Sequence, residues 1–187
     1  MRKSFLFFVL VAVLCVPHFS VGIEPVAALA PAFADEYVPS AGDYPARIRI
    51  PSIKLDSPIQ HVGLTSGGAI DVPDGSTNLV GWYAGGAIPG EYGNAIMDAH
   101  VFAAFKNLHF ANVGDEISIE NANGERQRFV ISDARVYALS EVPMADMVHA
   151  DAGRRLVLIT CAGKFNFSLG TYSHRLVVYA NLIEENQ

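Results

Sequence analysis

Residues 113–124 read Val-Gly-Asp-Glu-Ile-Ser-Ile-Glu-Asn-Ala-Asn-Gly, and this stretch decides the fold class. Apolar and polar side chains alternate through Glu116–Glu120, which is the pattern of a strand with one buried face. Asn121–Gly124 then supplies the residues of a hairpin turn, and the run from Arg126 to Leu139 predicts a long returning strand. The sequence therefore predicts a β-hairpin here and a mostly β protein around it.

Short apolar or alternating runs, separated by Gly, Pro, Asp and Ser, lie on both sides of this hairpin. They predict further strands at residues 47–50, 53–62, 69–72, 79–84, 94–100, 156–161 and 176–182. Only two segments are typical of helices, Phe102–Ala111 and Pro143–Ala150. About eight short strands bounded by turn signals indicate a closed or nearly closed β-barrel with two short helices.

The chain begins with a leader that predicts export. Arg2 and Lys3 precede an apolar stretch that runs from Phe5 to Ile23, and Ala32-Phe33-Ala34 has the small-x-small form of a signal-peptidase site. Cleavage after Ala34 would release the domain, whereas an uncleaved segment approaches the ~20 residues that span a bilayer. With Arg2 and Lys3 on the cytoplasmic side, both outcomes place the rest of the chain outside the cytoplasm.

The chain beyond the leader has the size of one ordinary domain, about 150 residues. We expect a signal peptide or membrane anchor at residues 1–34, a tether at 35–45 and the domain at 46–187. The net charge of −6 and the absence of any Lys or Arg cluster argue against a nucleic-acid partner. One cysteine in the domain and scattered histidines do not give the ligand spacing of a zinc site, so we expect no metal and no cofactor.

Cys161 is the only cysteine outside the leader, because Cys15 lies within it. A single thiol in an exported domain cannot form an internal disulfide, so it is a buried inert residue, an intermolecular link or a reactive group. The apolar run Val157–Thr160 predicts a buried strand before it, and Ala162-Gly163 predicts the end of that strand and a turn. A cysteine at the mouth of a strand is rigidly held and can still be reached, which favours a nucleophile.

A nucleophilic cysteine needs a partner that holds it as a thiolate or accepts its proton, and histidines are the candidates. His100 ends the predicted strand Asn94–Ala99 and so lies at the same kind of strand end as Cys161. The other histidines of the domain lie on a proline-containing strand, in the two predicted helices and in the loop after Cys161; they are His61, His109, His149 and His174. His100 is therefore the preferred partner.

Several blocks of the sequence resemble the sortase family. Leu158-Ile159-Thr160-Cys161 is similar to the sortase signature Leu-x-Thr-Cys, and Arg175 matches the sortase arginine fourteen residues after the cysteine. Gly93–Ile96, which leads into His100, resembles the strand before the sortase histidine. Further similar blocks are Ile50–Ile53, Gly81–Tyr83 with Pro89-Gly90, and Val113–Glu116. The resemblance extends over residues 46–180 and is closest to class F, with class E next.

The residues around His100 depart from the family pattern, which is Ala-Gly-His followed by a residue such as Val, Arg or Asp. Here the run is Asp98-Ala99-His100-Val101-Phe102. Ala99 adds a methyl group where glycine allows close approach, and Phe102 takes a place where a polar residue is common. Asp98 lies on the same strand face as His100; it either favours the charged form of the imidazole or is a solvated residue at a strand end.

The resemblance implies a cysteine transpeptidase on a sortase-type barrel that attaches proteins to the cell surface. Cys161 would attack the threonine carbonyl of a Leu-Pro-x-Thr-Gly-like sorting signal, release the glycine side and form a thioester. An amine from a cell-wall precursor or a pilin would then resolve the thioester. His100 would protonate the departing amine, and Arg175 would hold the substrate backbone or the developing oxyanion. Thr160 is a weaker candidate for the oxyanion contact and otherwise bonds locally.

Two other classes of function remain open at this point. A secreted cysteine peptidase would use the same Cys161 and His100 but give the acyl group to water. A non-catalytic barrel would bind peptides or partner proteins, and the altered surroundings of His100 are its only support. All three readings place the domain outside the cytoplasm, either secreted or anchored to the outer face of the membrane.

Overall fold

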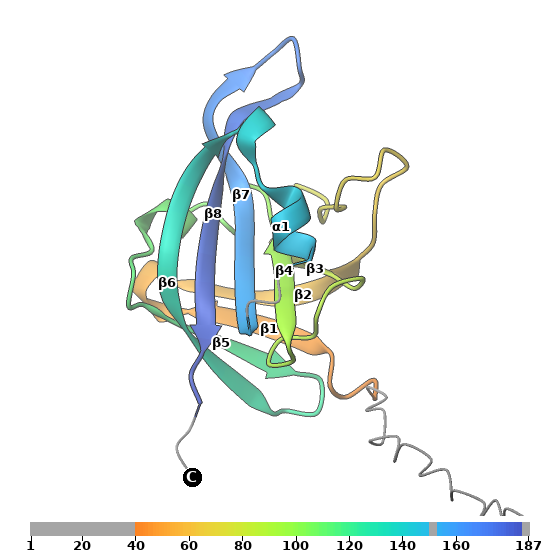
Figure 1. The fold of residues 1–187 in the computed structure, drawn as a ribbon, viewed down its shortest axis with the longest axis vertical. Helices are drawn as coiled ribbons and strands as arrows, with labels where there is room; N and C mark the ends of the chain where they lie inside the picture. The colour runs from red at the N-terminus through yellow and green to blue at the C-terminus, as the bar shows by residue number, and fades with distance from the viewer. Residues whose placement is uncertain (1–39, 150–152, 185–187) are drawn as a thin grey trace, which may run out of the picture. The chain divides into compact units, whose positions relative to one another are not determined.

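Eight strands pair edge to edge and close into a barrel in the computed structural model, which describes residues 40–149 and 153–184 (Figure 1). Around the barrel the order is β1-β2-β3-β4-β7-β8-β6-β5. The first four strands are β1 (Pro45–Ile50), β2 (Leu55–Val62), β3 (Val80–Tyr83) and β4 (Gly93–Asp98). The last four are β5 (Glu116–Asn121), β6 (Arg126–Ala138), β7 (Arg154–Asn166) and β8 (Thr171–Leu182).

Most neighbouring strands are antiparallel, but β2–β3 and β4–β7 are parallel pairs. In the β4–β7 pair the partners run from Gly93 with Arg154 to Asp98 with Ile159. The carboxyl ends of two parallel strands lie at the same edge, so the residues that follow β4 meet the middle of the longer β7. This end of the barrel faces the β7–β8 hairpin, which extends beyond the other strands in Figure 1.

The barrel interior is filled by apolar side chains from every strand. Ile48, Trp82, Met97 and Phe129 are among its members, and Phe105 enters from the segment after β4. The buried indole of Trp82 donates its Nε1–H to the carbonyl of Ala87 at 3.1 Å, so its polar atom is satisfied. Burial of this many large side chains supplies the main stabilisation of the fold.

A second apolar cluster lies on the outer face of β4, β7 and β8. Ile96, Val157, Ile159 and Val177 belong to it, and the short helix α1 (Met144–His149) covers them through Met147. Because side chains alternate along a strand, the odd-numbered residues of β7 point outward and the even-numbered ones inward. This alternation decides which side chains reach the candidate site.

The mostly β barrel predicted from the sequence is confirmed, and several details differ. Residues 69–72 form only an isolated bridge between Leu64 and Ile70 instead of a strand. The predicted helix Phe102–Ala111 is wrong, because this segment is a series of turns that ends in a 3-10 helix at Leu108–Phe110. The predicted helix at 143–150 is found as α1. Two further 3-10 turns occur at Pro51–Ile53 and Leu139–Glu141.

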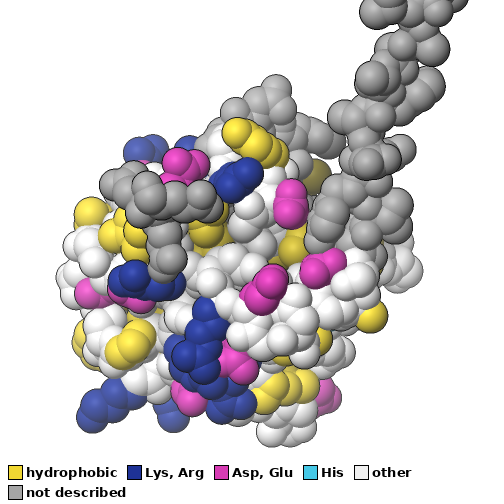
Figure 2. All heavy atoms as spheres, turned by 90° about the horizontal axis from the view of Figure 1, so that it is seen from below, with side chains coloured by type: hydrophobic (Ala, Val, Ile, Leu, Met, Phe, Trp, Pro, Cys, Tyr) yellow, Lys and Arg dark blue, Asp and Glu magenta, His cyan; other side chains and the backbone are white. Residues whose placement is uncertain are grey.

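The surface carries charges of both signs. On the face shown in Figure 2, Lys and Arg side chains lie next to Asp and Glu side chains instead of gathering into one basic patch. Among the described residues, no helix is long and apolar enough to cross a membrane. The predicted leader and residues 35–39 of the predicted tether lie outside the described residues.

Candidate active site

Strand register brings Cys161 and Arg175 face to face. They are direct partners in the antiparallel β7–β8 pair, and both are half-buried. Buried Thr160 precedes Cys161, and Leu176 of the barrel core follows Arg175, so by alternation Cys161 and Arg175 project from the outer face. The predicted end of the strand at Ala162 is wrong: β7 continues to Asn166 through an irregularity between Ala162 and Phe165. Gly163 adopts φ 76° within that irregularity, a conformation that favours glycine.

The last strand begins earlier than the predicted 176–182, so Arg175 lies within β8, and its guanidinium is held by residues of its own strand. Nη1 donates to the carbonyls of Tyr172 and His174, at 3.1 and 3.0 Å, and Nη2 donates to Thr171 Oγ1 at 3.0 Å. No carboxylate among the described residues forms an ion pair with it. A fixed cation without a counter-ion is therefore presented beside the thiol.

The electrostatic surroundings of the thiol act in opposite directions. Burial raises the pKa of Cys161 above its ordinary value, Arg175 lowers it, and the nearby carboxyl of Asp98 raises it. The thiolate is the nucleophilic form, so Arg175 favours reactivity whereas burial and Asp98 oppose it.

His100 follows β4 at the level of Cys161. Asp98 is the partner of Ile159 in the parallel pair, so two residues further along each chain place His100 next to Cys161. The imidazole stacks on the ring of Phe102, with centroids 4.8 Å apart and an angle of 16°. A Cβ at Gly75 would lie 3.0 Å from the Phe102 ring and 3.3 Å from His100, so the glycine leaves room for this stack.

Thr160 of β7 connects this strand to the end of β4 from the inside of the barrel. It is buried, and its hydroxyl donates a 2.7 Å hydrogen bond to the carbonyl of Ala99. This bond fixes the segment between Asp98 and His100 against β7. The Thr160 hydroxyl is thus already engaged in a local contact.

Asp98 differs from both readings of the sequence. It is not a solvated residue, because its Oδ1 is buried and has no hydrogen-bond partner among the described residues. Burial and the nearby carboxylate of Asp71 raise its pKa to about 8, against an opposing effect of Arg175. Asp98 is therefore an uncharged carboxyl over most of the range below pH 8.

Two cavities meet at Cys161. The first, of about 380 Å³, contains Cys161, His100, Arg175 and Asp98, and its remaining wall is largely apolar, with Ile70, Val72, Leu139, Val142, Met144 and Ile159. The second, of about 300 Å³, shares Thr160 and Cys161 with the first and is lined by Val101, Phe105, His109, Val136, Tyr172 and Leu176. A thiol at the border of two cavities can reach groups bound on either side of it.

The other histidines of the domain have different surroundings. The ring of His61 contacts Tyr44 and Trp82, with centroids 5.3 and 5.1 Å away. His174 Nδ1 is 2.7 Å from the hydroxyl of Ser173. His109 lines the second cavity and packs on Phe110. Only the backbone of His149 is described.

Sequence reasoning missed the loop residues that complete the site. Asp74 lies near enough to His100 for the imidazole to help lower the aspartate pKa, although its hydrogen bonds with Ser76 are the larger cause. Asp71 acts on Asp98, and Gly75 admits the His100–Phe102 stack. The run Pro73-Asp74-Gly75 is a turn signature, but nothing in its pattern shows which strand end the turn approaches.

This closed barrel, with a cysteine opposite an arginine and level with a histidine, defines a sortase-type fold, and solved structures agree. Sortase A from Corynebacterium diphtheriae superimposes with a TM-score of 0.56 at 22% identity, over 76% of this chain and 62% of that one. Sortase C1 from Streptococcus agalactiae gives 0.56 at 25% identity, over 76% and 68%. A Clostridium perfringens sortase D5 transpeptidase gives 0.58 at 24% identity, over 78% and 82%.

The chain belongs to the sortase family: the family model for the sortase domain matches residues 48–183. No curated protein matches the chain significantly. The structures named above represent classes A, C and D, so the resemblance to class F or E stays a prediction.

Proposed function

We propose that this chain is a cysteine transpeptidase that attaches proteins to the cell surface. It would cleave a sorting signal between Thr and Gly through a thioester on Cys161 and transfer the acyl group to an amine. The observation that carries the proposal is the position of Cys161 in one cavity with His100 and Arg175. It lies directly opposite Arg175, which has no carboxylate partner among the described residues, and level with His100. Membership of the sortase family supports the same reaction.

In the first half-reaction the Cys161 thiolate attacks the threonine carbonyl carbon, and the C=O electron pair moves onto oxygen. The oxyanion is stabilised by positive charge, which Arg175 supplies from a position fixed by its own backbone contacts. The tetrahedral adduct collapses as the C–N bond breaks. Protonated His100 donates its proton to the departing nitrogen, which leaves as a neutral amine.

In the second half-reaction an incoming amine attacks the thioester carbonyl. Neutral His100 takes up the proton that the amine loses, and the Cys161 thiolate leaves, so both groups return to their starting states. The first cavity suits the acyl-donating segment because it holds His100 and Arg175 between apolar walls. The second cavity, which also contains Cys161, would take the acceptor amine.

The leader and the family together support an enzyme outside the cytoplasm, either secreted or anchored at the membrane. We propose the organisation predicted from the sequence, with residues 1–34 as signal peptide or anchor, 35–45 as tether and 46–187 as the sortase domain. Its partners would be sorting-signal peptides and amines of cell-wall precursors or pilins.

Competition between water and an amine tests the transpeptidase against the peptidase. We expect residues 35–187 to cleave a Leu-Pro-x-Thr-Gly-like peptide slowly when alone, and added glycine- or lysine-type amines to shift the product from free acid to conjugate. A thioester held where water is badly oriented and an amine is well placed gives this partition. Mass spectrometry of the products measures it, with Cys161→Ala as the control that should form no product.

Free acid at every amine concentration would favour the peptidase. No covalent adduct at Cys161 with any peptide of a sorting-signal library would favour the non-catalytic barrel. Product from a folded Cys161→Ala variant would exclude Cys161 as the nucleophile.

A further inference from the structure

Asp98 lines the first cavity, which the proposed function assigns to the acyl-donating segment and which we call the donor cavity. Asp98 ends β4, with Gly81 of β3 as its partner on one side and Ile159 of β7 on the other. A Cβ at Gly81 would lie 2.9 Å from Asp98 Oδ1, so β3 leaves space for the carboxyl only because residue 81 has no side chain. Asp98 lines the same cavity as Cys161, His100 and Arg175.

One oxygen of the carboxyl, Oδ1, has no hydrogen-bond partner within the described part of the chain. Oδ1 is buried and accepts no hydrogen bond, and the N–H groups of Arg175 are directed to residues of its own strand. Buried polar atoms in proteins are nearly always hydrogen-bonded, and one left unpaired costs free energy. Burial raises the pKa of Asp98, with a further contribution from Asp71, as expected for an acid without a hydrogen-bond donor.

A purely structural role does not account for this residue. An apolar side chain would fill the space beside Ile159, Ile70 and Val72 without the cost of desolvating a carboxyl. The partner that satisfies Asp98 is therefore expected to arrive with the molecule that enters the cavity.

We propose that Asp98 selects the sorting signal by hydrogen bonding to an N–H or O–H group in the three residues that precede its threonine. The proposal rests on the proposed function, because it assigns the donor cavity to the acyl-donating segment. In a Leu-Pro pair neither side chain is a donor and proline also lacks the backbone N–H, so only the backbone N–H of leucine remains. A signal that carries a further donor where the segment meets Asp98 is therefore expected to react faster than Leu-Pro-x-Thr-Gly.

Matched peptides test this in the chain from residue 35 to 187. Starting from Leu-Pro-x-Thr-Gly, each of the three positions before threonine is varied in pairs that differ by one donor. Glutamine is compared with leucine at the first position, alanine with N-methylalanine at the second, and lysine with norleucine at the third. The measurement is kcat/KM for formation of the Cys161 adduct or of the amine conjugate.

For wild-type protein we expect a donor-bearing peptide at one of the positions to react about tenfold faster than its matched partner, or more, as for other buried polar contacts. In Asp98→Ala this ratio should fall to near one. Asp98→Asn keeps an acceptor oxygen and should retain part of the preference. Asp146→Ala, at an exposed aspartate of α1, should keep the wild-type ratio and serves as the matched control. Thermal unfolding and the alkylation rate of Cys161 show whether each variant is folded.

The outcomes separate the two proposals. Equal reactivity within every peptide pair, or a preference that survives Asp98→Ala, would overturn the selection by Asp98 and leave the transpeptidase intact. If Asp98→Ala did not fold, loss of the preference in Asp98→Leu together with a partial loss in Asp98→Asn would support the proposal, and a full preference in both would end it. Failure of all peptides to label Cys161 would instead end the proposed function, and the selection with it.

Discussion

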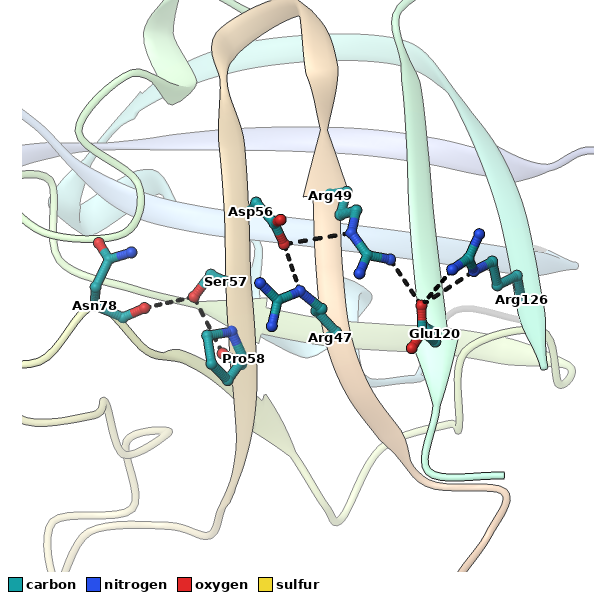
Figure 3. A network of polar contacts seen from close by, with 8 residues as sticks. All are labelled: Arg47, Arg49, Asp56, Ser57, Pro58, Asn78, Glu120 and Arg126. Carbon is teal, nitrogen blue, oxygen red and sulfur yellow. Dashed lines mark hydrogen bonds and ion pairs between the residues drawn. The ribbon is translucent and has the colours of Figure 1, made fainter. Parts of the chain in front are cut away.

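Two groups of charged side chains on the barrel differ in whether their members have partners of opposite charge. On β1, β2, β5 and β6, Arg47 and Arg49 pair with Asp56, and Arg49 and Arg126 pair with Glu120, at 2.5–3.4 Å (Figure 3). Each charge in this network has a partner. A hydrogen bond from Arg47 lowers the pKa of Asp56, and hydrogen bonds from Arg49 and then Arg126 lower that of Glu120.

At the end of β4 the arrangement is reversed. Oδ1 of Asp98 is buried without a hydrogen bond, Arg175 has no carboxylate partner in the described part of the chain, and both residues act on the pKa of the Cys161 thiol. Charges that satisfy one another stabilise a surface modestly and have nothing left for a ligand. Groups left without partners in a cavity are available to a substrate, so the difference supports the proposed role of the second region.

The largest expected effect comes from removing the unpaired charge. Arg175→Ala should lower the rate of acyl-enzyme formation about 10²–10³-fold, the usual cost of losing one oxyanion contact. Arg49→Ala removes a partnered arginine of the network and should leave the rate near the wild-type value. Mass spectrometry of the Cys161 adduct over time measures both. An equal loss in the two variants would remove the contrast between the regions.

A loss of similar size is expected for His100→Ala, because no proton donor would remain for the departing amine. His61→Ala, His109→Ala, His149→Ala and His174→Ala should each have far smaller effects on the same rate. If His174→Ala lowered this rate most, His174 and not His100 would be the catalytic imidazole. His174 pairs with Ala162, the residue after Cys161.

An effect of intermediate size is expected on the free energy of unfolding, and its dependence on pH should have opposite signs in the two regions. The Asp98 carboxyl has a pKa of 3.8 in the unfolded chain and about 8 in the fold. Between these values the unfolded chain releases the proton and the folded chain keeps it, so the free energy of unfolding falls as pH rises through this window and levels off above it. Each unit of this difference is worth about 1.4 kcal/mol.

Asp98→Asn removes that slope, so its stability relative to wild type should rise steadily from pH 4 to pH 8. The pKa of Asp56 is lowered instead, so the stability it contributes is present above pH 4 and is lost as pH falls below that. Asp56→Asn should therefore be the less stable protein, by a small amount, at neutral pH. Denaturant unfolding at a series of pH values measures both, and parallel profiles for the two variants would show that Asp98 is not an isolated buried acid.

The sequence singled out residues that the fold brings together, but it did not predict their surroundings. Cys161 and His100 stand out because strand ends are local patterns, whereas Arg175 was identified through the resemblance to the sortase family. The β4–β7 and β7–β8 registers then place the three residues together. The extent of β7 beyond Cys161 was not predicted, because Ala162-Gly163 is a turn signal in the sequence and an irregularity within a strand in the fold.

The burial of Asp98 could not be predicted, since it depends on contacts between distant segments. Gly81 makes room for the carboxyl from β3, and Asp71 approaches from the loop between β2 and β3. The helix predicted for residues 102–111 is wrong for a related reason. Its apolar residues suggested a helix face, yet Phe105 and Leu108 enter the barrel core from turns, where tertiary packing overrides local propensity.

The smallest expected effect is on the Cys161 thiol itself. Its pKa is raised first by burial, lowered by Arg175 and raised by Asp98. Asp98→Asn should therefore shift the alkylation profile of Cys161 to lower pH, and Arg175→Ala should shift it to higher pH. The first shift should stay below about one pH unit, because Asp98 carries its charge only near and above pH 8 and the two groups titrate together. Iodoacetamide labelling followed by mass spectrometry gives the profiles, with Asp56→Asn as the variant that should not move. A shift to higher pH in Asp98→Asn would show that the carboxyl supports the thiolate, and the contrast between a paired surface network and an unpaired site would need a different physical basis.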